Sequence, residues 1–207
     1  MFDHRPSQEE ISKWFAGFKL HEGLKHEQYV GGIVAIETKD RGVSTWMLYI
    51  NATARISYFW DWCDHNKYIA HIDVSEPIDR IVELPADKKS RQFYMVAEVV
   101  VVETADNPDA QGRVVRQVTG RKQVDTTSFR RGYNGAAGTV VPDSNAIMKA
   151  ETGSIARALG ALGMLALPGS GIATAEDMVE YLGVQAEPAK EEAKAAPQTK
   201  AVSNPKK

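Results

Sequence analysis

The residues best suited to bind a ligand lie between Gln111 and Arg131. This segment of 21 residues contains one carboxylate, Asp125, and its local charge is +5, whereas the formal net charge of the whole chain is -2. Its six cations are Arg113, Arg116, Arg121, Lys122, Arg130 and Arg131. Cations at this density neutralise phosphates, so the segment is typical of a strand that follows a nucleic-acid backbone. The net charge itself gives no argument for nucleic acid, because only local clustering can build an anion-binding surface.

Two aromatic residues, Phe129 and Tyr133, follow this basic stretch in the Gly-rich segment Asp125–Ser144. Aromatic rings stack on unpaired bases while neighbouring cations hold the phosphates. A segment of this length without regular structure is usually functional or disordered. Two other interpretations stay open, since the cations could form a solvated strand face or make contacts between subunits.

Metal and catalytic chemistry find little support in the sequence. His21 and His26 do not have the i, i+4 spacing of a zinc-binding helix. Four other potential ligands are too crowded to converge on one ion from a regular element: Asp61, Cys63, Asp64 and His65. Neither a Walker motif nor a G-x-G-x-x-G motif occurs. We therefore expect a protein that is not an enzyme and that needs no metal or cofactor, with Cys63 as a buried structural thiol.

The segment Asn145–Leu165 is predicted to form a long helix rich in small residues. Its apolar stripe indicates that it packs on a broad partner such as a sheet. Two cations, Lys149 and Arg157, are eight residues apart and therefore share a face of this helix. The pattern alone favours a core helix with two solvated cations.

Two further helices are expected before it. Ser7 and Glu10 fit a capping box, which predicts an amphipathic helix from about Ser7 to Leu20. The stretch Trp46–His65 is ambiguous, because its aromatic residues favour a strand and its spacing favours a helix. We predict a helix there. Arg55 would then lie within a largely apolar surface, where its charge needs a partner or a phosphate.

The remaining patterns predict an antiparallel sheet and an α+β fold. Four stretches are strand-like: Ile33–Thr38, Tyr68–Val74, Gln92–Glu103 and Arg113–Val124. The last two form a long hairpin, with Tyr68–Val74 beside it in a meander. This sheet, three-stranded or slightly larger, would pack on the long helix. A short helix, Thr174–Leu182, follows, and the composition from Gln185 onward predicts a disordered tail.

The composition indicates a soluble protein. A single cysteine cannot form an internal disulfide, which suits a reducing cytosol. No apolar run approaches the length of a membrane span, and the N-terminus does not have the pattern of a signal peptide. We expect a cytoplasmic protein without a membrane partner.

The sequence Lys149–Gly163, KAETGSIARALGALG, resembles the "KAETxAxGRALAxLG" helix of phage-encoded single-strand DNA-binding and annealing proteins. These proteins belong to the Rad52-like group, which includes the Erf and Sak families. The segment Ile172–Met178 is similar to an "IASxEEM" segment that often follows that helix. The chain departs from the pattern at Gly153, which replaces a charged or polar residue, and at Ala156, which replaces a glycine.

The resemblance implies a Rad52-like β-β-β-α core that binds single-stranded DNA in a basic groove between the sheet hairpin and the helix layer, as a ring or filament, without a cofactor. It carries over Lys149 and Arg157 as the matched helix cations that would bind DNA, although Arg157 could instead lock the helix to a carboxylate. The phage type would place the protein in the host cytoplasm. The resemblance covers about Tyr49 to Leu182, so we expect three parts: an N-terminal helix and lead-in over 1–44 without a counterpart in the family, the DNA-binding domain over 45–183, and a tail over 184–207 that the composition predicts to be disordered. The expected activity is ATP-independent annealing of complementary strands in recombination or replication. The alternatives are protection of single strands without annealing, and an oligomeric interaction protein that does not bind DNA.

Overall fold

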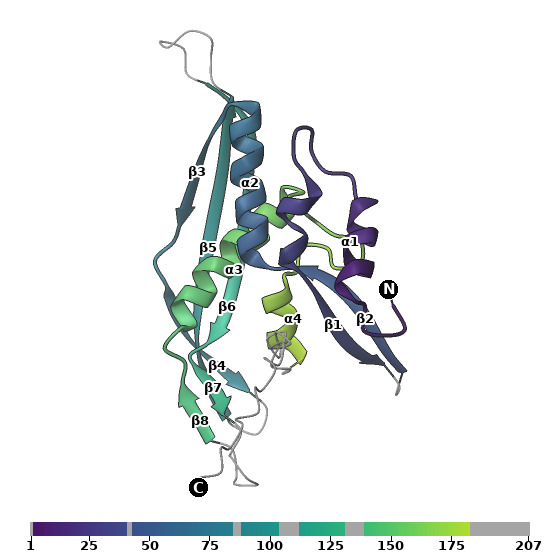
Figure 1. Cartoon of the computed structure of the whole chain (residues 1–207). Helices are drawn as coiled ribbons and strands as arrows, with labels where there is room; N and C mark the ends of the chain where they lie inside the picture. The colour runs from purple at the N-terminus through teal and green to yellow at the C-terminus, as the bar shows by residue number, and fades with distance from the viewer. Residues whose placement is uncertain (1, 41–42, 85–87, 104–111, 131–138, 183–207) are drawn as a thin grey trace, which may run out of the picture.

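The computed structural model describes residues 2–40, 43–84, 88–103, 112–130 and 139–182 (Figure 1). It has the expected α+β character, with mostly antiparallel strands. The helices are α1 (Gln8–Ala16), α2 (Ala52–Asn66), α3 (Ala146–Ala161) and α4 (Ala175–Leu182). The strands are β1 (Ile33–Asp40), β2 (Val43–Ile50), β3 (Tyr68–Val74), β4 (Ile78–Leu84), β5 (Lys88–Glu103), β6 (Arg113–Asp125), β7 (Thr127–Arg130) and β8 (Thr139–Pro142).

The main sheet is built around β5, the longest strand. β6 pairs antiparallel along one edge of β5, and β3 and β4 lie end to end along its other edge (Figure 1). Between them, the Ser75 N–H donates to the Val96 carbonyl at 2.8 Å and the Ser75 hydroxyl accepts from the Val96 N–H at 3.0 Å. The sheet is therefore three strands wide, as the meander prediction requires.

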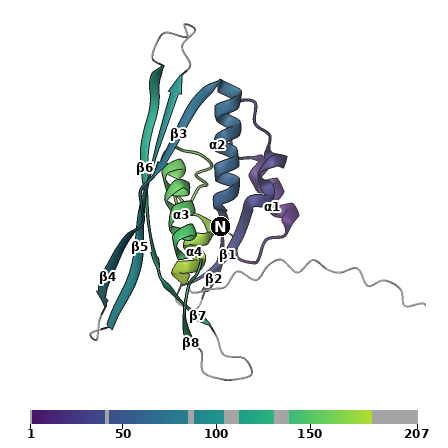
Figure 2. The same cartoon turned by 90° about the vertical axis from the view of Figure 1, so that its left-hand side faces the viewer.

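One face of this sheet is covered by α2 and α3, and no described element packs on the other (Figure 2). Alternate residues of β5, namely Ala97, Val99 and Val101, are fully buried against the helices. The β-branched run of β5 explains this burial, because such side chains pack well on a pleated surface. We refer to the opposite side of the sheet as the uncovered face.

The contact between α3 and β6 depends on Gly120. A Cβ atom at this position would lie 2.1 Å from the Ser154 carbonyl oxygen and 2.3 Å from the Ala158 nitrogen. The absence of a side chain therefore lets the helix backbone approach the strand closely. The small residues of α3 serve the same packing, since Ala150, Ser154 and Ala158 are fully buried.

The N-terminal third of the chain belongs to the same core. β1 and β2 form a separate antiparallel hairpin, and the boundary expected between residues 44 and 45 falls within β2. Ile11 and Phe15 of α1 are buried in one cluster with Val99 of the main sheet. The expected capping box of α1 is confirmed, because Ser7 and Glu10 cap each other's backbone N–H groups.

The prediction of one helix over Trp46–His65 is wrong in its first part. Residues up to Ile50 form β2, and α2 begins only after Asn51, whose side-chain oxygen accepts from the Ala54 N–H at 2.7 Å. Pairing with β1 decides the conformation of the aromatic residues there, which the helical spacing alone could not reveal.

Other differences concern the loops and helix ends. β4 was not expected, and the segment Asp125–Ser144, expected to lack regular structure, contains β7 and β8, which pair with each other. The long helix ends at Ala161, and Gly163 has a φ of 93° in the turn beyond it. The tail expected to be disordered lies outside the described residues.

Candidate nucleic-acid interface

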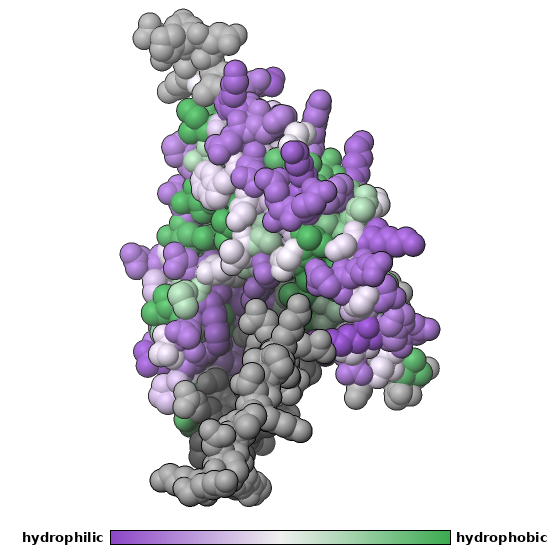
Figure 3. Space-filling model, in the orientation of Figure 1, coloured by the Kyte–Doolittle hydropathy of each residue, from purple (hydrophilic) through white to green (hydrophobic). Residues whose placement is uncertain are grey.

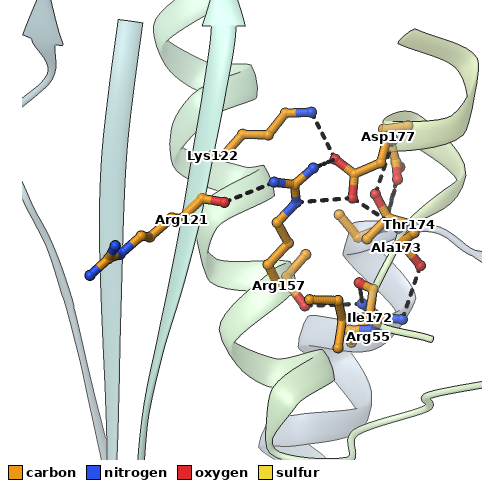
Figure 4. Close-up of polar contacts among 11 residues, drawn as sticks. Arg55, Arg121, Lys122, Arg157, Ile172, Ala173, Thr174 and Asp177 are labelled. Atoms are coloured by element: carbon orange, nitrogen blue, oxygen red, sulfur yellow. Dashed lines mark hydrogen bonds and ion pairs between the residues drawn. The ribbon is translucent and has the colours of Figure 1, made fainter. Parts of the chain in front are cut away.

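The cations of β6 do not form one surface, because neighbouring residues of a strand point to opposite faces. Lys122 pairs with the buried Met95 and points to the helix-covered face, whereas Arg121 pairs with Val96 on the uncovered face. Figure 4 shows the two side chains leaving β6 in opposite directions.

Lys122 and Arg157 converge on a buried carboxylate, Asp177 of α4 (Figure 4). The Lys122 Nζ donates to Asp177 Oδ1 at 2.7 Å, and Arg157 Nη2 donates to the same oxygen at 3.0 Å. The other oxygen accepts from the Thr174 N–H at 3.0 Å. The side chains of Lys122 and Asp177 are only 7% and 6% exposed. We call these four residues the Asp177 cluster.

The cluster keeps Asp177 ionised. Burial alone raises the pKa of this carboxyl group, but the Lys122 ammonium, the Thr174 N–H and the Arg157 guanidinium outweigh burial, and the net pKa is lowered. An ionised carboxylate in turn holds β6, α3 and α4 together, since each contributes a partner.

Lys122 and Arg157 therefore do not serve as free DNA-binding cations, contrary to the expectation from charge and from the resemblance. Arg157 also donates to the Arg121 carbonyl at 3.0 Å, which fixes α3 to the edge of β6. Gly153 accommodates this arrangement, because a Cβ there would lie 2.9 Å from Cγ of Lys122. The departure from the family pattern at Gly153 thus leaves room for the lysine stem.

Arg55 is likewise part of the core and not of a phosphate-binding surface. Its side chain is fully buried in α2, and Nη1 donates to the carbonyls of Ile172 at 2.7 Å and Ala156 at 3.0 Å. Burial lowers its pKa to about 10, although the charges of Asp177 and Glu176 oppose this effect, so it stays protonated at neutral pH. The sequence predicted that the charge of Arg55 needs a partner, and in the structure that partner is a set of backbone carbonyls.

Two other predicted cations are exposed but paired. Arg113 lies 3.1 Å from Glu103, and Lys149 lies 2.5 Å from Asp143. The Lys149 ammonium lowers the pKa of Asp143, against the opposing effect of partial burial. Exposed pairs of this kind add little stability. They do, however, reduce the net positive charge that these positions offer to a phosphate.

Arg116 and Arg121 are the predicted cations that remain exposed without an ion pair among the described residues. Arg116 pairs with Val101 and so stands at the end of the helix-covered face, while Arg121 stands on the uncovered face. Arg130 is the last residue of β7 and pairs with Thr139. Arg131 and Tyr133 lie outside the described residues.

The sequence reasoning missed an arginine–aromatic pair on the uncovered face. Cζ of Arg80 in β4 lies 4.5 Å from the ring centroid of Tyr94 in β5. Arg80 is exposed, and Tyr94 is partly buried in the sheet. The signal available in the sequence was weak, because Ile78–Leu84 contains the β-branched residues Ile78, Ile81 and Val82 but no alternation of apolar and polar residues.

The described residues support no metal site and no membrane span. Among them, no group of three or more His, Cys, Asp or Glu side chains could hold a metal ion. No described helix has both the length and the apolar character needed to cross a bilayer. Cys63 is buried as expected, and burial together with the nearby Asp64 raises the pKa of its thiol to about 12.

Figure 3 shows the polar character of the molecular surface on the side that faces the viewer in Figure 1. Hydrophilic side chains predominate there, with apolar ones scattered between them. The chain matches neither the models of known protein families nor any curated protein sequence.

Proposed function

We propose that this protein binds single-stranded DNA and promotes the annealing of complementary strands without ATP. The observation that carries the proposal is the uncovered face of the main sheet, from which Arg121 projects without a carboxylate partner among the described residues. An open sheet with a cation can lie along a phosphate backbone and leave the bases accessible for pairing. Neither a metal nor a nucleotide cofactor is needed for such binding.

The backbone around Arg121 is held rigidly. Its carbonyl accepts from Arg157, whose guanidinium is bound to Asp177, and its neighbour Lys122 is part of the same cluster. The paired cations Lys122 and Arg157 thus position the strand, and the exposed Arg121 is left to contact the ligand. The charge of Arg121 therefore stays available on a strand, β6, that is held in place, and this lowers the entropic cost of binding.

The strand order adds support from the resemblance. Three strand positions of the main sheet, occupied by β3 and β4, then β5, then β6, are followed by the hairpin β7–β8 and by α3, which packs on the sheet. The resemblance implies three strands followed directly by the helix and DNA between the two layers, so β4 and the hairpin β7–β8 are additional, and the proposed contact on the uncovered face differs from that groove. In this chain α3, which contains the sequence that carries the resemblance, packs on the sheet, and its Arg157 is ion-paired with Asp177. We therefore place the contact with DNA on the sheet.

A gel shift across salt concentrations tests the proposal. A labelled single-stranded oligonucleotide should be shifted at low salt, in preference to a duplex, and the affinity should fall steeply as salt rises. Arg121→Ala should weaken binding several-fold and reduce the salt slope by about one, because one phosphate contact is lost.

Arg113→Ala is the matched control, because it removes the same charge from the same strand but from a residue already paired with Glu103. It should weaken binding less than Arg121→Ala. If the protein does not shift single-stranded DNA at low salt, the proposed function is excluded. If Arg121→Ala and Arg113→Ala weaken binding equally, Arg121 is not the specific phosphate contact.

Annealing is measured separately from binding. Two complementary labelled strands should pair faster with the protein than without it, in the absence of ATP. Binding without acceleration would reduce the function to protection of single strands.

A second candidate function is that of an oligomeric interaction protein that does not bind DNA. It is favoured by the apolar side chains on the part of the uncovered face beside β3, where Ile69 is 49% and Val114 is 54% exposed. Val102 of β5 lies between Ile69 of β3 and Val114 of β6, and Val100 is the next residue of β5 on the same face. A large oligomer by light scattering, together with the absence of any gel shift, would favour this role.

A further inference from the structure

The pair Arg80–Tyr94 has the features of a stacking site on the uncovered face. The register places both side chains there, because Arg80 is opposite Gln92 and Tyr94 is opposite Gln123. The guanidinium lies over the aromatic ring at 4.5 Å. Since Arg80 is exposed, the other side of its planar group is open to solvent.

No carboxylate of the described residues forms an ion pair with Arg80, although Asp125 lies on the same face across Gln92. Asp79 points to the opposite face, where its two oxygens accept from Nε of Arg91 at 3.0 and 2.8 Å. Asp125 accepts from Ser90 and Gln92, both at 2.7 Å. Among the described residues, the Tyr94 ring is therefore the one partner of the Arg80 guanidinium, through the quadrupole of the ring.

Two neutral amide side chains, those of Gln92 and Gln123, lie beside the Arg80–Tyr94 pair. The Gln123 side chain donates to Gln92, and Gln92 donates onward to Asp125, so a chain of amides crosses from β6 to β5 beside Tyr94. Amide groups can hydrogen-bond to base edges without selecting one base strongly. A cation, an aromatic ring and amides together are the composition of a site for unpaired bases.

We propose that Arg80 and Tyr94 form a subsite in which the Arg80 guanidinium is held between the tyrosine ring and one unpaired base. The inference rests on the proposed function and names the part of the ligand that this position recognises. A guanidinium is planar and weakly hydrated, so it stacks on π systems on both sides, unlike a lysine ammonium. Stacking also selects single strands, because bases within a duplex do not present a free face.

Arg121 can hold a phosphate of the same strand. Along β5, Arg80 lies beside Gln92 and Arg121 lies beside Val96, four residues further, and β4 and β6 are on opposite edges. Strand geometry then separates the two Cα atoms by roughly 16 Å. At about 3.4 Å per stacked nucleotide, this distance corresponds to about five nucleotides. Oligonucleotides shorter than this should not reach both residues.

Fluorescence of 2-aminopurine, an adenine analogue that is quenched by stacking, tests the subsite. The full chain is titrated into single-stranded oligonucleotides of about ten nucleotides with one 2-aminopurine, placed in turn at each position. The wild type should quench at least one position. Arg80→Lys keeps the positive charge but removes the planar guanidinium that stacks on the base. It should therefore abolish this quenching and weaken binding about tenfold, while the salt slope stays unchanged.

Tyr94→Leu should have the same effect as Arg80→Lys, whereas Tyr94→Phe keeps the ring and should restore quenching. Arg91→Lys is the matched control, because Arg91 is on the same sheet but faces the other side and is paired with Asp79. Circular dichroism of each variant checks that the fold is retained.

Quenching that survives in both Arg80→Lys and Tyr94→Leu would overturn the subsite, and if Arg121→Ala still weakens binding the proposed function would stand. A wild-type protein that shifts no single-stranded DNA at low salt would overturn both. Loss of quenching in Arg80→Lys with an unchanged salt slope supports stacking over a simple charge contact.

Discussion

At the scale of single residues, the main result is that three cations expected to bind a ligand are engaged within the protein, two of them buried and one, Arg157, partly exposed. Arg55, Lys122 and Arg157 belong to segments whose composition fits a DNA-binding surface, yet each has its partners within the protein. A buried charge is costly without partners, and those of Lys122 and Arg55 are a carboxylate and a set of backbone carbonyls, although Nε of Arg55 has no hydrogen-bond partner among the described residues. Exposure and pairing, which the sequence does not show, separate them from Arg121.

Arg55→Lys is expected to destabilise the fold. Nη1 of Arg55 reaches the Ile172 and Ala156 carbonyls from one rigid guanidinium, and Nη2 lies 3.4 Å from the carbonyls of Leu165 and Ala173. A lysine ammonium cannot reach all of these acceptors, and the buried carbonyls left without donors should cost about 2–3 kcal/mol. Urea denaturation measures the loss.

The exposed Arg116 supplies the control, since Arg116→Lys should change the free energy of unfolding by less than about 0.5 kcal/mol. DNA affinity per folded molecule should be unaffected by Arg55→Lys. Equal stability of the two variants would contradict the structural role of Arg55.

At the scale of elements, the packing of α3 on β6 is the most sensitive contact. It requires a strand residue without a side chain, and Gly120 supplies it. Gly120→Ala should cost about 1–3 kcal/mol, because the new methyl group meets helix backbone, which cannot move without displacing α3. Thermal unfolding should show a clear decrease in the midpoint.

Gly31→Ala is the matched control, because a Cβ at Gly31 meets nothing within 4 Å. Its midpoint should stay close to that of the wild type. A Gly120→Ala protein as stable as Gly31→Ala would show that α3 does not pack as closely as described.

The elements that the sequence predicted well are those with one dominant pattern. β3 matches Tyr68–Val74, and β5 and β6 extend the predicted strands by a few residues, because β-branched runs leave no alternative. Trp46–Ile50 fits two periodicities, and only its pairing with β1 decides for a strand. The charge of β6 was visible in the sequence, but the burial of Lys122 depends on a helix 55 residues later in the chain.

At the scale of the whole molecule, the segment from Ile172 to Asp177 connects most of the core elements. Its carbonyls accept from Arg55 of α2, Glu176 accepts from the Ala52 N–H at the start of α2, and Asp177 binds β6 and α3. The carboxylate of Glu176 at this helix N-terminus also favours the α2 dipole. Few residues late in the chain therefore decide whether the layers stay together.

The pH dependence of stability tests this arrangement. The pKa of Asp177 is lower in the folded protein than in the unfolded chain, so its contribution is fully present above the unfolded pKa of about 3.9 and is lost as the pH falls through the lower, folded pKa. Asp177→Asn should cost about 3–5 kcal/mol at pH 7, because Lys122 and Arg157 lose their counter-charge. This difference from the wild type should shrink steadily below about pH 4.

Asp79→Asn is the matched control, because Asp79 binds Arg91 at the surface and connects only β4 and β5. Its pKa is also lowered, chiefly by the hydrogen bonds from Arg91, so it has the same sign of pH dependence. Solvent screening should keep its effect small at every pH. Urea unfolding of both variants from pH 7 to pH 3 separates the two sites, and a difference for Asp177→Asn that does not change with pH would mean that its carboxylate is not the charge that holds β6, α3 and α4 together.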